Sequence, residues 1–265
     1  MFGQSLLSAF GSAACTTDTD QLFATDVQTT SVATYQLNNA TTSIPSNTYP
    51  GTANNITYAT GKFGNAAVFN GSSSSIGISS STINPANVYS LSMWVNFDNA
   101  SAYTGFFANN TSAFRVGEIS IMKPNATKLQ VLSGGQAGTN LLDNLEAQPS
   151  SSFVNNTWYH IVVISDRSIS NQRAKVFVNG IECSYIHYGA NQSSVSTYSD
   201  TKIGLADNQY FPGKIDQVRI FNSSLPQPAI TALYNETTTT AQSASVDYQL
   251  ANPNSVAYYK MSDAT

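Results

Sequence analysis

Between residues 31 and 235, short apolar runs alternate with Gly, Asn and Ser, a pattern typical of a chain built from many short strands. Residues 91–97 carry Leu, Met, Val and Phe at every second position, so these four side chains are expected on one face of a strand. Residues 158–164 are apolar on both faces, as in an interior strand of a sandwich. Further strands are predicted over residues 66–70 and 213–221.

Two local signals add a turn and a helix to this set of strands. Asn179-Gly180 lies inside residues 175–183 and favours a hairpin with a type I′ turn, which needs two positive φ angles. Residues 228–235 predict one short helix, because Ile230 and Leu233 share a face. Many strands and one helix indicate an all-β fold, a two-sheet antiparallel β-sandwich of the jelly-roll type with an extended N-terminal arm.

The chain divides into four parts by composition. Residues 1–30 lack strand-like alternation and are interpreted as an arm; residues 31–236 form the sandwich; residues 237–254 are a Thr/Ser-rich linker. Residues 255–265 match residues 31–41 at six of eleven positions, with an offset of 224. The match indicates the start of a second repeat, although two strands of similar composition also explain it.

Five segments follow one another in a characteristic order: GKFGNAAVFNG at 61–71, LSMWVNF at 91–97, NTWYHIVV at 156–163, AKVFVNG at 174–180 and FPGKIDQVRIFN at 211–222. Together with the helix that follows, this order resembles the laminin G-like, concanavalin A-like lectin/glucanase jelly rolls over residues 31–236. The resemblance implies two packed antiparallel sheets of about six or seven strands each. It leaves the function open, because this fold includes both binding modules and glycanases.

Composition excludes some classes of function. Only 10% of residues are charged and the net charge is -4, so the chain lacks the basic face of a general nucleic-acid binder. A hydrophobic share of 41% is enough to fill a core and argues against disorder. There is no apolar run of about 18 residues to span a membrane. Cys15 and Cys183 are expected to be unpaired thiols, with a disulfide as the alternative.

No catalytic constellation is visible in the sequence. Glycan-cleaving relatives carry a Glu-x-Asp-x-x-Glu strand, whereas none of the four Glu residues here has another acid nearby on the same strand face: Glu118, Glu146, Glu182 and Glu236. His160 lies in a strand and is expected to be a packed histidine. The sequence therefore predicts a protein that is not an enzyme.

Sugar sites combine aromatic faces with amides, and loops of this chain offer both. The candidate carbohydrate-binding residues are Tyr103, Phe107, Asn109, Tyr198, Asn208 and Tyr210. Each of them has packing within its own loop as the alternative role. No cofactor is predicted other than a calcium ion.

Asp216 is the candidate metal ligand. Alternation places Asp216 on the same face as Val218 and Ile220, and a carboxylate on such an apolar face needs a partner. The resemblance implies a structural Ca²⁺ at this position, with Asn39 or Asn38 as a further ligand. The alternative is that backbone N–H groups of a neighbouring loop satisfy the carboxylate.

Two functional hypotheses of different class follow. In the first, the chain is a phage virion structural protein on the virion surface, as a capsid decoration, head fibre or tail appendage. Leu6, Leu7 and Phe10 would then anchor the arm to other virion proteins or to copies of itself. The alternative is a secreted or cell-surface carbohydrate-binding or adhesion module. Both hypotheses describe a protein that binds, with surface glycans as the expected partners.

Overall fold

The computed structural model describes residues 31–43, 49–78, 88–109, 119–135, 142–166, 174–188 and 201–236. The predicted arm at 1–30, with Leu6, Leu7, Phe10 and Cys15, lies outside the described residues. So do the predicted linker at 237–254, the repeat at 255–265 and Tyr198.

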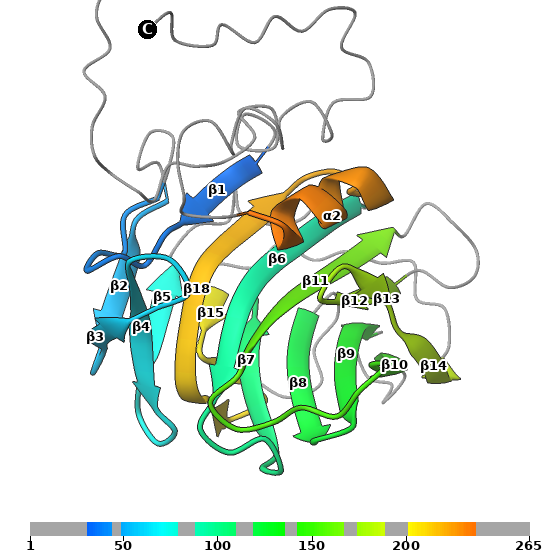
Figure 1. The fold of residues 1–265 in the computed structure, drawn as a ribbon, viewed down its shortest axis with the longest axis horizontal. Helices are drawn as coiled ribbons and strands as arrows, with labels where there is room; N and C mark the ends of the chain where they lie inside the picture. Colours follow the sequence, from blue (N-terminus) through cyan, green and yellow to red (C-terminus); the bar gives the residue numbers. More distant parts are fainter. Residues whose placement is uncertain are drawn as a thin grey trace, which may run out of the picture.

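Eight strands form the first sheet, called sheet A. All its pairings are antiparallel, in the order β13-β12-β11-β6-β18-β4-β3, with β1 also paired to β18 (Figure 1). Its strands are β1 (Ser31–Tyr35), β3 (Thr57–Thr60), β4 (Asn65–Asn70), β6 (Val88–Phe97), β11 (Trp158–Asp166), β12 (Ala174–Val178), β13 (Ile181–Glu182) and β18 (Pro212–Phe221).

Eight further strands form sheet B, in the order β14-β10-β9-β8-β7-β15-β5-β2. They are β2 (Gly51–Asn54), β5 (Ser75–Ile78), β7 (Thr104–Ala108), β8 (Ile119–Asn125), β9 (Lys128–Gly135), β10 (Leu142–Gln148), β14 (Ser184–Tyr188) and β15 (Thr201–Ile203). A two-stranded hairpin, β16 (Leu205–Ala206) and β17 (Gln209–Tyr210), completes the strands of the described residues. The predicted two-sheet antiparallel sandwich is confirmed.

The core lies between the two sheets and is rich in aromatic rings. The alternating residues of β6 point inward as predicted, since Leu91, Met93, Val95 and Phe97 all belong to the main buried cluster. The ring of Phe97 contacts four other rings at centroid distances of 5.1 to 6.4 Å: Phe106, Phe153, Tyr159 and Phe211. Burial of each such side chain is worth about 1.5–3 kcal/mol, so this cluster is a major source of stability.

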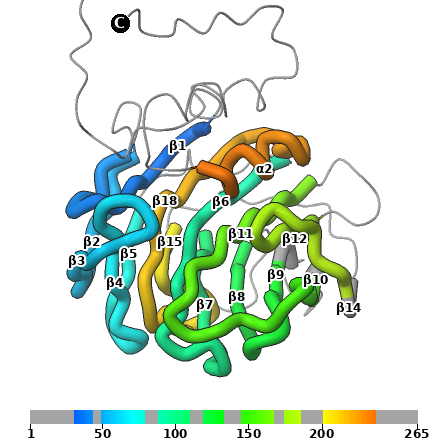
Figure 2. Tube along the Cα trace, in the orientation of Figure 1, coloured from blue at the N-terminus to red at the C-terminus, as the bar shows by residue number. Residues whose placement is uncertain are grey.

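Helix α2 (Gln227–Tyr234) covers part of the outer face of sheet A, where Figures 1 and 2 show it beside β6, β11 and β18. Pro228 lies in its first turn, where a missing N–H costs nothing. Ile230 and Leu233 are buried against Phe221 and Val162, which confirms the predicted apolar face. The hairpin turn is also confirmed, because Asn179 and Gly180 have φ angles of 52° and 78°.

A β-bulge in β18 changes which residues face the core. Cross-strand pairing with β6 joins Asp216 to Trp94 and then skips to Arg219, and the φ angle of Gln217 is 51°. The extra residue lets Val218 point into the core and turns Asp216 to the outer face of sheet A. The prediction that Asp216 shares a face with Val218 and Ile220 is therefore wrong.

Three apolar positions in and just after β1 stay apolar in the predicted repeat. Ala33, Tyr35 and Leu37 are fully buried, and the Tyr35 hydroxyl donates to the Tyr49 carbonyl at 2.7 Å. At an offset of 224, these three positions are Ala, Tyr and Met in residues 255–265. The similarity thus includes core-facing positions of a strand, and the second repeat stays a prediction.

An ion pair between Arg219 and Glu236 joins the end of the helical segment to sheet A. The Arg219 Nη2 to Glu236 Oε2 distance is 2.8 Å, and the two side chains are 1% and 4% exposed. Arg219 Nη2 also donates to Gln217 Oε1 at 3.4 Å. Because both charges are buried, loss of the Glu236 carboxylate removes the hydrogen-bonded counter-charge of a buried guanidinium.

Glu236→Gln should therefore lower the free energy of unfolding by about 3 kcal/mol, measured by urea denaturation. Glu182→Gln is the matched control, because Glu182 forms its ion pair with Lys175 at 3.7 Å on an exposed hairpin. An equal, small effect of both substitutions would show that the buried pair does not fasten the helix.

Candidate functional site

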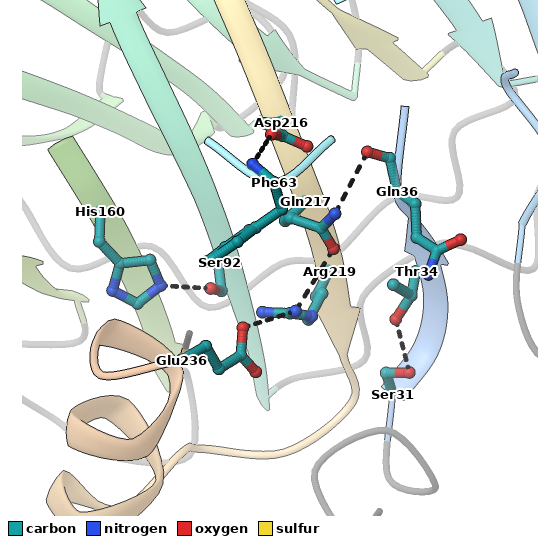
Figure 3. Close-up of polar contacts among 10 residues, drawn as sticks. All are labelled: Ser31, Thr34, Gln36, Phe63, Ser92, His160, Asp216, Gln217, Arg219 and Glu236. Atoms are coloured by element: carbon teal, nitrogen blue, oxygen red, sulfur yellow. Dashed lines mark hydrogen bonds and ion pairs between the residues drawn. The ribbon is translucent and has the colours of Figure 1, made fainter. Parts of the chain in front are cut away.

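The bulge in β18 places a set of polar side chains on the outer face of sheet A, shown in Figure 3. Asp216 is fully buried there, and its Oδ2 accepts hydrogen bonds from the backbone N–H groups of Lys62 and Phe63 at 2.9 and 3.0 Å. Asp216 therefore ties the turn that contains residues 61–64 to strand β18. This arrangement agrees with the alternative in which backbone donors satisfy the carboxylate.

The neighbouring histidine has a packing role. His160 Nε2 and Ser92 Oγ lie 2.8 Å apart (Figure 3). The imidazole packs beside Trp94 and Tyr234 at ring centroid distances of 5.1 and 6.2 Å. Burial, reinforced by the positive charge of Arg219, lowers the pKa of His160 to about 3. The ring is therefore neutral at physiological pH, as the sequence-based interpretation of a packed histidine requires.

Few of the described residues could join Asp216 as ligands of the predicted calcium ion. They contain no group of three or more His, Cys, Asp or Glu side chains arranged to hold a metal ion. Asn38 Oδ1 accepts the backbone N–H of Asn65 at 3.1 Å, and Asn39 has a φ angle of 59° in the turn after β1. In this structure the Asp216 carboxylate thus accepts hydrogen bonds from backbone N–H groups of the chain.

We predict that Asp216→Ala lowers the free energy of unfolding by roughly 1–3 kcal/mol, because two buried N–H donors lose their acceptor. Addition of EDTA to the wild-type protein should leave the melting temperature unchanged, since those donors come from the chain. A fall in melting temperature with EDTA, reversed by Ca²⁺, would instead support a metal at Asp216.

The second candidate site is the face of sheet B that points away from sheet A. Ile119, Ile121, Leu129 and Val131 of β8 and β9 point into the core, so the residues between them point outward. Cross-strand pairing aligns Met122 with Gln130 and Gln130 with Glu146, and it aligns Ser120 with Leu132. The outer face therefore presents the amide of Gln130 and the carboxylate of Glu146, both partly exposed, whereas the Met122 thioether is buried at 1% exposure.

Tyr103 lies at one end of this face. Its hydroxyl donates to Met122 Sδ at 3.1 Å, while 42% of the residue stays exposed to solvent. Partial burial and the carboxylate of Asp207 both raise the pKa of the Tyr103 hydroxyl, which places that carboxylate near the ring. Tyr103 is thus an accessible aromatic ring beside hydrogen-bonding groups.

The β16–β17 hairpin borders the same end of the face. Ala206 packs with Ala108 and Met122, and a Cβ at Gly105 would lie within 2.5 Å of the Ala206 carbonyl, so only glycine permits this approach. Asp207 and Asn208 form the turn with φ angles of 48° and 58°, and Asn208 is exposed. The Tyr210 carbonyl accepts a hydrogen bond from Thr104 Oγ1 at 3.0 Å, which fixes β17 to β7.

The structure therefore brings together three of the predicted carbohydrate-binding residues: Tyr103, Asn208 and Tyr210. Two others are buried elsewhere, because Phe107 belongs to the core and Asn109 Oδ1 accepts the backbone N–H of Ile119 at 2.7 Å. Phe107 and Asn109 line a cavity of about 10 Å³, which admits at most one water molecule and no sugar ring. These two are not accessible loop residues, contrary to the prediction.

Met122 and Gln130 were not predicted, because the candidate binding residues were all assigned to loops and these two lie within strands. The signal was present in the alternation of residues 119–123 and 128–132, where polar or adaptable side chains stand between core residues. Lys128 and Glu146 form an ion pair of 3.0 Å on the same sheet, with side chains 32% and 25% exposed.

The described helix is not long enough to cross a membrane.

Comparison with known proteins assigns the family. Residues 70–231 match the model of the concanavalin A-like lectin/glucanases superfamily, in its laminin G form. The chain belongs to this superfamily, and the resemblance found in the sequence is confirmed. No curated protein sequence matches the chain.

The chain is similar to several solved structures with the same architecture. Domain 4 of AbnA, an extracellular arabinanase of family GH43 from Geobacillus stearothermophilus, was solved in complex with arabinotriose. It is 25% identical with a TM-score of 0.61, over 77% of this chain and 97% of that one. The chain is also similar to the receptor-binding domain of a botulinum neurotoxin C/D mosaic, at 14% identity and a TM-score of 0.58, over 78% of this chain.

Botulinum neurotoxin type C, which depends on two ganglioside molecules to enter cells, gives 12% identity and a TM-score of 0.57 over 80% of this chain. Both toxin structures are longer, and this chain spans about half of their length. At these identities the toxin similarities show the fold alone.

Proposed function

We propose that residues 31–236 are a non-catalytic carbohydrate-binding module. Its binding surface, called the Tyr103 face, consists of Tyr103, Gln130, Asn208 and Tyr210 on and beside the outer face of sheet B. The observation that carries the proposal is the accessible ring of Tyr103, held by its hydroxyl over Met122 and bordered by the Asp207-Asn208 turn.

The chemistry of the Tyr103 face suits a neutral sugar. An exposed aromatic ring offers an apolar surface to the C–H face of a pyranose or furanose. The amides of Gln130 and Asn208 each supply two donors and an acceptor, which match the hydroxyls of a sugar. The nearby Lys128 and Glu146 charges are paired with each other, so they give the surface little net charge.

Arabino-oligosaccharides are the first ligands to test. AbnA domain 4, the similar structure that aligns over nearly its whole length, was solved with arabinotriose. We infer a related specificity for arabino-oligosaccharides here. Because the protein is proposed to bind only, it should release no reducing ends from arabinan.

The biological setting that fits this proposal is a secreted or cell-surface carbohydrate-binding or adhesion module. The virion hypothesis depends on residues 1–30 as an anchor, which lie outside the described residues. It remains a separate prediction about where the module is displayed, and it does not alter the binding chemistry.

Tyr103→Ala should weaken binding of arabinotriose by about tenfold or more, measured by isothermal titration calorimetry, because the stacking surface is removed. Asn208→Ala should weaken it less, since one set of hydrogen bonds is lost. Ile181→Ala is the control: Ile181 is also exposed, but on a hairpin of sheet A.

Equal affinity of wild type, Tyr103→Ala and Ile181→Ala would place the sugar elsewhere on the sandwich. No measurable binding of arabinotriose by the wild-type protein would contradict the proposed specificity.

A further inference from the structure

We propose that Lys123 is a positioning residue of the Tyr103 face: its buried ammonium group holds the turn at residues 98–102 from which Tyr103 projects. This inference rests on the proposed function, because the turn matters for binding only if Tyr103 contacts the sugar. Nothing in the sequence marks Lys123, and the strand that contains it was not predicted.

The contacts of Lys123 are unusual for a lysine. The residue lies on β8 and is fully buried, whereas lysines are almost never buried without a partner. Its Nζ donates to the carbonyl oxygens of Ala100 and Ala102, each at 2.6 Å. The same Nζ lies 5.1 Å from the ring centroid of Phe97, in a cation–π contact.

The turn at 98–102 is organised around this ammonium group. Asn99 accepts two N–H groups of the turn, from Ser101 at 3.0 Å and from Ala102 at 3.3 Å. The N–H of Ala100 donates to Asn155 Oδ1 at 2.7 Å, which fixes the turn from the other side. Two carbonyls then converge on Lys123, and they would be orphaned without its donors.

Strand β8 thus holds Tyr103 from both faces of sheet B. Lys123 binds the backbone just before Tyr103 from the core side. Met122, the preceding residue on the strand, accepts the Tyr103 hydroxyl on the outer side. The two contacts together set the position of the ring relative to Gln130, which pairs with Met122.

No carboxylate forms an ion pair with Lys123 among the residues that the structure describes. The acidic residues of the adjoining elements interact with other groups. The charge of Asp207, in the β16–β17 hairpin, affects the Tyr103 hydroxyl, and Glu146 of β10 forms an ion pair with Lys128. Asp98, at the start of the turn, forms none of the ion pairs of the described residues, and its backbone N–H donates to the Pro212 carbonyl. Burial, with no compensating acid, lowers the pKa of Lys123 to about 8.

Deprotonation of Lys123 has two opposite consequences. Above about pH 8 the amine is neutral, and its hydrogen bonds to the two carbonyls are no longer charge-assisted. The turn is then held less firmly, and sugar binding weakens. The folded state no longer buries a charge, however, while the unfolded state keeps its proton up to the ordinary lysine pKa. Stability contributed by this residue therefore rises with pH between these two pKa values.

The test compares wild type with Lys123→Met, which has a similar length and no charge, from pH 6.5 to 9.5. Arabinotriose affinity of the wild type should fall about tenfold across this range, and that of Lys123→Met should be low and independent of pH. In parallel urea denaturations, the stability of the wild type relative to Lys123→Met should increase with pH. A lysine with a merely structural role would move binding and stability in the same direction.

Two further measurements separate this inference from the proposed function. Tyr103→Phe should keep the wild-type pH profile of affinity, which excludes titration of the Tyr103 hydroxyl as its cause. The NMR signals of the Tyr103 ring, assigned by their loss in Tyr103→Phe, should shift with a midpoint near pH 8 in the wild type and not in Lys123→Met. This shift needs no sugar.

A pH-dependent ring shift without arabinotriose binding would support Lys123 as the positioning residue and contradict the sugar assignment. A ring signal that does not move between pH 6.5 and 9.5, or wild-type affinity in Lys123→Met at every pH, would overturn the role of Lys123.

Discussion

The packing of Phe97 between the two sheets is the contact on which the rest of the structure depends. Its ring contacts rings of β7 and β11, together with Phe153 before β11 and Phe211 before β18. It also faces the ammonium group of Lys123. This fixes which face of β6 and β8 points inward. The period of two along each strand then places Met122 and Gln130 on the outer face of sheet B, where the proposed sugar surface lies.

Alternation and turn chemistry predicted most of the fold. Residues 91–97 and the Asn179-Gly180 turn were readable because each pattern has one physical solution. The position of Asp216 was not predicted, because a β-bulge interrupts β18 after this residue. Phe107 was expected in a loop, but it lies in the buried strand β7, which has no alternation of apolar and polar residues to mark it. The bulge in β18 has no diagnostic sequence, so a strict period of two assigned Asp216 to the wrong face.

The candidate site was only half predictable for a related reason. Tyr103 and Asn208 stand in loops, where exposed aromatic and amide groups suggest binding. Gln130 lies within a strand and looks like an ordinary solvent-facing residue until the register aligns it with Met122. Lys123 and Arg219 are charged residues that the structure buries, and only the tertiary contacts reveal the carbonyls and the carboxylate that compensate them.

The central claim is that the outer face of sheet B, beside Tyr103, receives a sugar. An NMR titration of the isotope-labelled protein with arabinotriose tests it directly, because amide shifts report where the ligand lies. The account predicts the largest changes at Tyr103, Gln130 and the Asp207-Asn208 turn, with little change around Asp216 and helix α2. Changes confined to sheet A would contradict it.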